Sequence, residues 1–119
     1  MQIQLFKDST SALPFAAGTI IFNEGDAPGG VMYVVVEGQV DIAVHGKVID
    51  TIGAGASLGE IGLVDKQPRT ATATARTDCR LEVIDARRFQ FMVQQTPFFA
   101  LEMMETLVAR LRREREHTR

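Results

Sequence analysis

Residues 31–52 read Val31-Met-Tyr-Val-Val-Val-Glu-Gly-Gln-Val-Asp-Ile-Ala-Val-His-Gly-Lys-Val-Ile-Asp-Thr-Ile52, three strand patterns joined by short turns. Residues 31–36 form a continuous apolar run, and residues 40–44 alternate apolar and polar side chains, as a half-buried strand does. His45-Gly46 has the composition of a two-residue hairpin turn into residues 47–52. The stretch therefore predicts consecutive antiparallel strands.

Similar patterns lie on both sides of this stretch. Residues 19–22 are β-branched and aromatic, and residues 70–75 and 80–84 alternate. Six or more short strands at spacings of about ten residues are typical of an antiparallel sandwich or barrel. We therefore expect residues 13–85 to form one β structure.

The hydrophobic period changes after Asp85. Asp85 is a good N-cap for a helix over residues 86–94, and Thr96-Pro97 supplies the N-cap and first residue of a second helix that ends near Glu116. The apolar side of the first helix comprises Phe89, Met92 and Val93. The prediction is an α+β fold in one domain over residues 1–119, with helices at about 86–94 and 97–116.

The second helix carries a wide apolar stripe, which comprises Ala100, Leu101, Met104, Leu107, Val108 and Leu111. One interpretation is core packing, in which Phe98, Phe99, Leu101 and Val108 pack on the barrel. The other is a homodimer seam through Ala100, Met104, Leu107 and Leu111, which have coiled-coil spacing. Leu111 is the strong apolar anchor of the last two turns, so we expect those turns to fray easily.

Size and composition agree with one soluble domain. The chain has 119 residues, 45% of them hydrophobic, and a formal net charge of −2. A domain this long buries a core without a disulfide, and the single cysteine, Cys79, is expected to be structural. No apolar run approaches the ~20 residues of a membrane span, and residues 1–15 lack a signal-peptide pattern. We expect a cytoplasmic protein.

Charge is distributed unevenly along the chain. Residues 1–68 carry three lysines and eight acidic residues, a net of −5, whereas residues 69–119 carry ten arginines and seven acidic residues, a net of +3. The basic C-terminal residues could contact nucleic acid, but a charged helix end is more often only solvated. We therefore expect no nucleic-acid partner.

Residues 58–69 have the composition of an anion site. Gly59 and Gly62 allow close approach to the backbone, and a helical turn starting at Glu60 would direct free N–H groups at one point. Arg69 could form a fork onto the same anion, and Glu60 could accept from a hydroxyl. This set predicts a sugar-phosphate site. The alternative is a surface ion pair between Glu60 and Arg69, with glycines that serve only turns.

Other kinds of site have little support. Residues 53–59 resemble a dinucleotide-binding glycine pattern but lack its βαβ context. The only histidines, His45 and His117, are far apart in the sequence, and no Ser-His-Asp set or carboxylate pair stands out. We therefore expect no catalytic residues, no metal and no cofactor.

The motif Leu58-Gly-Glu-Ile-Gly-Leu63, a five-residue spacer and Arg69-Thr-Ala-Thr-Ala-Thr-Ala75 resemble the phosphate-binding cassette of cyclic nucleotide-binding domains. Residues 20–26, 32–34 and 37–40 are similar to the first half of these domains. The family includes catabolite-activator regulators, cyclic-nucleotide-dependent kinases and gated channels. The resemblance covers residues 13–113 and implies an eight-stranded, jelly-roll-like β-roll with a short phosphate-binding helix and flanking helices.

The resemblance also implies roles for individual residues. Glu60 would accept from the ribose 2′-hydroxyl, and Arg69 would bind the cyclic phosphate together with backbone N–H groups of the turn Gly59, Glu60, Ile61 and Gly62. Thr70 would reach the phosphate or the base edge. Arg110, on the last helix, would lie near the pocket. The implied function is a non-catalytic regulatory domain that binds cAMP in preference to cGMP and acts on an effector protein that the sequence does not identify.

The sequence departs from the family pattern at three places. The turn over residues 25–30 is one residue longer than usual and is expected to lie away from the pocket. Glu114 and Arg115 replace a Thr-Ser pair that caps adenine in activator-type members, and Thr70 also occurs in guanine-preferring members. The chain stops at Arg119, before a winged-helix domain could fit, so we expect a stand-alone domain. The alternative is a nucleotide-free β-roll that serves as a protein-interaction or dimerisation module.

Overall fold

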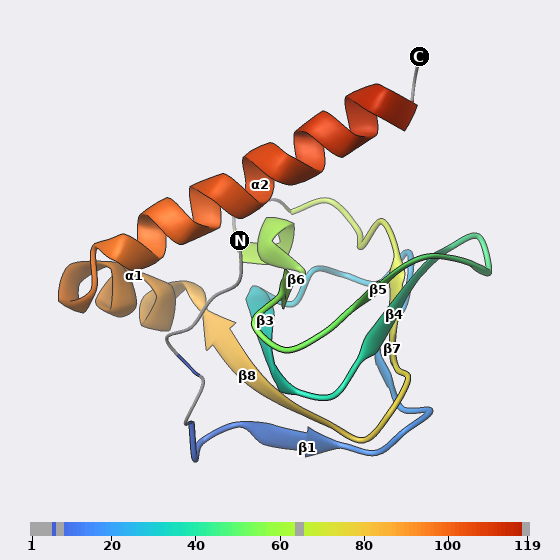
Figure 1. Cartoon of the computed structure of the whole chain (residues 1–119), viewed down its shortest axis with the longest axis horizontal. Helices are drawn as coiled ribbons and strands as arrows, with labels where there is room; N and C mark the ends of the chain where they lie inside the picture. The colour runs from blue at the N-terminus through green and yellow to red at the C-terminus, as the bar shows by residue number, and fades with distance from the viewer. Residues whose placement is uncertain (1–5, 7–8, 64–65, 118–119) are drawn as a thin grey trace.

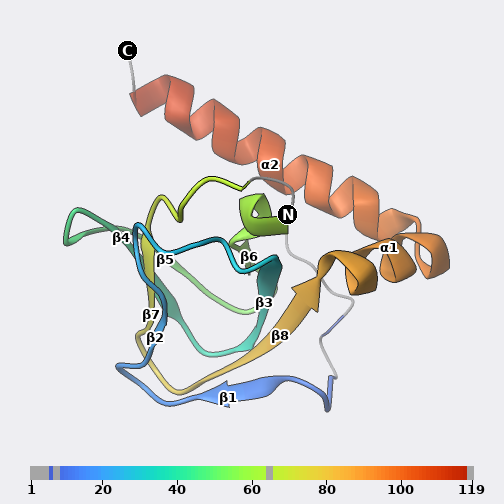
Figure 2. The same cartoon turned by 180° about the vertical axis from the view of Figure 1, so that it is seen from behind.

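Two four-stranded antiparallel sheets form the body of the molecule (Figures 1 and 2). The computed structural model describes residue 6 and residues 9–63 and 66–117. The strand order is β1-β8-β3-β6 in one sheet and β2-β7-β4-β5 in the other. The strands are β1 (Leu13–Phe15), β2 (Ile20–Phe22), β3 (Val31–Glu37), β4 (Val40–Val44), β5 (Lys47–Ile52), β6 (Ser57–Leu58), β7 (Thr72–Ala75) and β8 (Cys79–Asp85). The predicted eight-stranded β-roll is confirmed.

The central hairpin has the predicted bounds. β4 and β5 pair antiparallel and are joined by His45 and Gly46, whose φ angles are 52° and 80°. Positive φ at both residues is the requirement of a type I′ turn, whose twist matches that of the strands. The short strands β1 and β6 carry too few residues to show a period, and no pattern in the sequence indicated them individually.

β3 is apolar along most of its length because both of its faces are buried. Met32 and Val34 belong to a core cluster that includes Phe99 and Met103 of the last helix. Val35 belongs to a second cluster inside the roll, with Val40, Leu58, Ala73, Ala75, Cys79 and Leu81. β3 thus separates the interior of the roll from the helical layer.

Helix α1 (Ala86–Gln95) begins at its predicted cap: the Asp85 carboxylate accepts from the Arg88 N–H at 2.7 Å. Thr96, the predicted N-cap of the next helix, accepts from the Phe99 N–H at 2.9 Å through its carbonyl, while its own N–H donates to the Met92 carbonyl at 2.8 Å and so ends α1. Helix α2 (Phe98–His117) starts one residue after Pro97. No helix in the described part of the chain is long and apolar enough to cross a membrane.

The expectation that Phe98, Leu101 and Val108 pack on the roll together with Phe99 is wrong. Phe99 is fully buried, whereas Phe98 is 72% exposed and Leu101 and Val108 are 51% and 47% exposed. The inward face of α2 follows the series 99, 103, 106 and 110, and positions 101, 104, 108 and 111 lie on the opposite side of a helix of 3.6 residues per turn. The apolar stripe therefore points away from the core.

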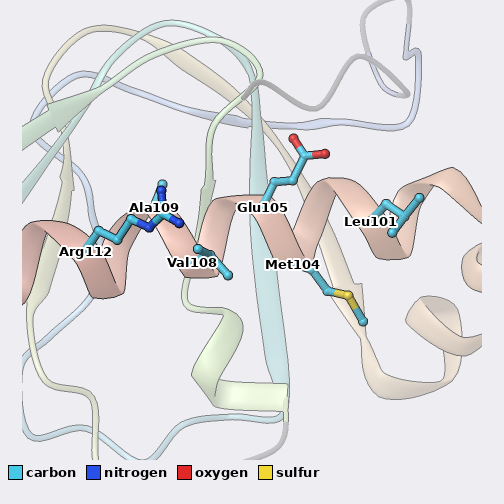
Figure 3. A pocket seen from close by; sticks show the side chains of 6 residues that line it. All are labelled: Leu101, Met104, Glu105, Val108, Ala109 and Arg112. Carbon is cyan, nitrogen blue, oxygen red and sulfur yellow. The ribbon is translucent and has the colours of Figure 1, made fainter.

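A shallow hollow runs along this outward face (Figure 3). Its lining comes entirely from α2: Leu101, Met104, Glu105, Val108, Ala109 and Arg112. Glu105 and Arg112 place opposite charges among the apolar side chains.

A buried carboxylate, Glu82 on β8, connects Ser9 and Ser11 to the helical layer. Its Oε1 accepts from Ser9 and, at 2.6 Å, from Ser11, and its Oε2 lies 2.9 Å from Arg88 Nη2 of α1. Burial alone raises the pKa of Glu82, but the hydrogen bonds from Ser11, Ser9 and Arg88, together with the charge of Arg88, outweigh it and lower the pKa.

Candidate functional site

Arg69 is the centre of the candidate site and is almost completely buried, with 8% of its surface exposed. Its Nη1 donates to the Gly59 carbonyl and its Nη2 to the Val31 carbonyl, both at 3.1 Å. The guanidinium lies over the Phe22 ring, with 4.3 Å between Cζ and the ring centroid. Its Nε is buried and has no hydrogen-bond partner among the described residues. The site therefore holds a desolvated cation with an unused donor, which is an arrangement suited to an anion.

Glycine at positions 59 and 62 makes room for this guanidinium. A Cβ on Gly59 would lie 2.6 Å from Arg69 Nη1, and one on Gly62 would lie 2.7 Å from Nη1 and 2.9 Å from the Val31 carbonyl oxygen. Gly59 also has a φ of +73°, which favours glycine. Gly62 forms the first turn of the short 3-10 helix η1 (Glu60–Leu63), since its N–H donates to the Gly59 carbonyl at 2.9 Å. The predicted turn is present, with 3-10 geometry.

Glu60 is also buried, but its partner is not Arg69. Its Oε2 accepts from the Ser57 hydroxyl at 3.0 Å, and both of its oxygens accept from Arg110 Nη1. Arg110 Nη2 donates to the Ser57 carbonyl. The alternative prediction of a surface ion pair between Glu60 and Arg69 is wrong, because both side chains are buried and each has other partners.

Helix α2 passes over η1, and Arg110 joins the two elements (Figures 1 and 2). The expected anchor of the last turns, Leu111, is 59% exposed and lies on the outward stripe. The helix is instead held by the Arg110 contacts to Glu60 and Ser57. A polar side chain on the inward face thus replaces the predicted apolar anchor.

The turn over residues 25–30 does not lie away from the site. Arg69 N–H donates to the Asp26 carbonyl at 2.7 Å, and Gly25 N–H donates to the Arg69 carbonyl at 2.8 Å. This pair of backbone bonds fixes the position from which the Arg69 side chain enters the site. The expectation was taken from the family pattern, but in this protein the roll brings the turn against the backbone of residue 69.

The remaining predicted residues have different environments. Thr70 is exposed, whereas the side chains of Ile61, Glu114 and Arg115 lie outside the described residues. Two residues that the sequence did not single out complete the site: Phe22 under the guanidinium and Ser57 on the carboxylate. The three-residue spacing from Ser57 to Glu60 was the available signal for Ser57. Phe22 had none, because its contact depends on a strand distant in sequence.

The geometry brings an arginine, a glycine turn and a carboxylate into one place, together with a helix that covers them. An anionic group could replace the carbonyl partners of Arg69, and a hydroxyl could bind Glu60. Within the described part of the chain, no group of three or more His, Cys, Asp or Glu side chains could hold a metal ion.

Comparison with known proteins agrees with this geometry. The family model of the cyclic nucleotide-binding domain matches residues 12–96. The chain is 34% identical over 95 residues to isozyme 2 of the cGMP-dependent protein kinase of Drosophila melanogaster. The matched stretch is 80% of this chain and 9% of the kinase, so the chain corresponds to a small part of that relative.

Two solved structures have the same fold. The Thermus thermophilus catabolite activator protein superposes with a TM-score of 0.79 at 27% identity, over 90% of this chain and 52% of that one. A structure from work on a cyclic-GMP-dependent signalling pathway that regulates bacterial phytopathogenesis superposes with a TM-score of 0.73 at 29% identity, over 84% and 82% of the two chains. The chain belongs to the cyclic nucleotide-binding domain family.

Proposed function

We propose that the protein binds a 3′,5′-cyclic nucleotide at Arg69 and Glu60 and acts as a regulatory domain without catalysing a reaction. The observation that carries this proposal is the buried Arg69 guanidinium, packed against Gly59 and Gly62 and left with an unpartnered Nε–H. A buried donor without an acceptor is costly, and the cyclic phosphate would satisfy it. The buried free thiol of Cys79 suits the reducing cytoplasm, which we propose as the location.

Each part of the ligand has a matching group. The phosphate would accept from Nε and Nη2 of Arg69, with Nη2 leaving the Val31 carbonyl, and from the first N–H groups of η1. The ribose hydroxyl would donate to Glu60. Thr70, which is exposed beside Arg69, would reach the phosphate or the edge of the base.

Ligand entry requires a rearrangement. Glu60 and Arg69 are both more than nine-tenths buried, and Arg110 of α2 holds the Glu60 carboxylate. The ligand must therefore displace side chains or shift α2. A ligand that prefers one position of α2 changes the population of that position, and this is how binding would become a signal to an effector protein.

We expect cAMP to be preferred to cGMP. cGMP is the second candidate. It is supported by Thr70, which follows Arg69, and by similar proteins that are described as cGMP-dependent or as part of a cyclic-GMP-dependent pathway. Both nucleotides therefore belong in the same experiment.

Thermal denaturation with and without nucleotide tests the proposal. At a ligand concentration 100-fold above Kd, binding adds about 2.7 kcal/mol to the free energy of unfolding. For a domain of this size the melting temperature should rise by about 8–15 °C. AMP at the same concentration is the control, since it lacks the cyclic phosphate. No rise with millimolar cAMP or cGMP would favour the alternative function, a nucleotide-free interaction module.

We also propose a homodimer through the outward stripe of α2. Leu101, Met104, Val108 and Leu111 are 47–61% exposed on one helix face. Glu105 and Arg112 are among the lining residues of the hollow in Figure 3, so that two antiparallel copies would bring unlike charges together. Sedimentation analysis should show a dimer that Met104→Lys converts to a monomer. A monomeric wild-type protein would contradict the homodimer and would make the stripe a candidate surface for the effector protein.

A further inference from the structure

We infer that Ser57 is a positioning residue for ribose recognition, which acts through the Glu60 carboxylate. This inference rests on the proposed function. Ser57 is 1% exposed, lies on β6 and donates its hydroxyl to Glu60 Oε2 at 3.0 Å. A buried hydroxyl needs a hydrogen-bond partner, and Glu60 is the partner that the structure gives it.

The backbone around Ser57 is held firmly, so its hydroxyl has a fixed direction. Ser57 pairs with Val34 of β3, and the preceding turn is bonded to Val35 by two backbone hydrogen bonds, each 2.8 Å long. These bonds run from Val35 N–H to the Ala56 carbonyl and from Gly55 N–H to the Val35 carbonyl. A group on a rigid strand holds its neighbour more closely than one on a loop.

Ser57 makes the two carboxylate oxygens unequal. Oε2 accepts from both Ser57 and Arg110, whereas the recorded partner of Oε1 is Arg110. A carboxylate oxygen has two lone pairs, so Oε1 retains acceptor capacity for a ribose hydroxyl. Without the Ser57 hydroxyl, the carboxylate can turn about its last side-chain bond, and the free lone pair of Oε1 loses its fixed direction. The ribose would then lose a pre-oriented acceptor.

The test compares affinities for a cyclic nucleotide and its 2′-deoxy analogue by titration calorimetry. Wild-type protein should bind the ribo form more tightly. Ser57→Ala should weaken the ribo form by about fivefold to tenfold and leave the deoxy form nearly unchanged, because only the hydroxyl contact depends on Ser57. Ser57→Cys, which preserves the packing but donates weakly, should change the ratio of affinities in the same direction.

Ser11→Ala is the matched control. It also removes a serine hydroxyl from a buried carboxylate, Glu82, and should leave both affinities unchanged. Equal losses for both ligands in the Ser57 variants, or an unchanged ratio, would overturn the inference while the proposed function stands. A wild-type protein that binds no cyclic nucleotide would overturn both.

Discussion

Glu60 and Glu82 are two buried carboxylates with similar partners and different surroundings. Each accepts from serine and is paired with an arginine of the helical layer, Arg110 of α2 for Glu60 and Arg88 of α1 for Glu82. Serine and arginine together offset the cost of burying a charge. The pairing alone therefore does not show which carboxylate belongs to a binding site.

The neighbours of the two carboxylates make the difference. Beside Glu60 lie Arg69, with its unpartnered Nε, and two glycines that admit a ligand to the backbone. Glu82 is surrounded by Ser9, Ser11 and Arg88, so that it links the segment before β1 to α1 through residues 9 and 11. We therefore propose that Glu60 serves ligand binding and that Glu82 serves stability.

The largest effect should follow the loss of the arginine beside Glu60. Arg69→Ala should weaken cyclic nucleotide binding by about 2–5 kcal/mol, or ~30-fold or more, because the phosphate loses its buried partner. Arg69→Lys should not restore it, since lysine lacks the planar fork. Titration calorimetry measures the loss, and Arg88→Ala, at the other carboxylate, is the control. Equal affinities of wild type and Arg69→Ala would place the phosphate elsewhere.

Glu82→Gln should lower stability without lowering affinity. We expect a loss of about 1–3 kcal/mol in the free energy of unfolding at pH 7, because Arg88 loses its charged partner. The pKa of Glu82 is lowered in the folded state, so its contribution is present above the pKa of the unfolded chain, about 4.3, and is lost as pH falls through the folded value. Urea denaturation from pH 7 to pH 3 should therefore show a shallower acid loss in the variant. If stability falls with pH equally in the variant and the wild type, Glu82 does not contribute to acid sensitivity in this way.

A smaller loss of affinity should follow substitution of Gly59 by alanine, and the same substitution at Gly29, which has a similar backbone conformation, should not cause it. Gly59 and Gly29 both have a φ of +73°, but a Cβ on Gly29 has no neighbour within 4 Å, whereas one on Gly59 meets Arg69. Both alanine variants should lose about 1 kcal/mol of stability through backbone strain. Gly59→Ala alone should also bind about tenfold more weakly, because Arg69 is displaced. Equal affinities of the two variants would contradict this role of Gly59.

The smallest effect concerns the arginine that joins α2 to Glu60. Arg110→Met should increase hydrogen exchange in the second half of α2 by about fivefold, because α2 loses its half-buried ion pair with Glu60 and its contact with the Ser57 carbonyl. Arg112→Met, on the outward face of the same helix, should not. In wild type, ligand should raise protection in residues 58–72 and 104–115. Protection confined to 58–72 would mean that α2 does not respond to the ligand.

Local sequence patterns were sufficient to predict much of the secondary structure of this protein. Alternation and turn residues indicated β4, β5 and their hairpin, and Asp85 indicated the start of α1, because these features depend on neighbours within a few residues. The cassette from Leu58 to Ala75 indicated Gly59, Glu60, Gly62 and Arg69 as candidate site residues. Each of these signals lies within one short segment.

The tertiary structure decided what depends on distant neighbours. Periodicity identified the stripe on α2 but not its direction, and Phe99 and Met103 turned out to be the buried side chains, with the stripe outside. The ion pair between Arg110 and Glu60, 50 residues apart, and the contact of the Gly25–Asp26 backbone with Arg69 arise only when the roll closes. A sequence records which groups are available, whereas the partner of a buried charge is set by the packing that excludes water around it.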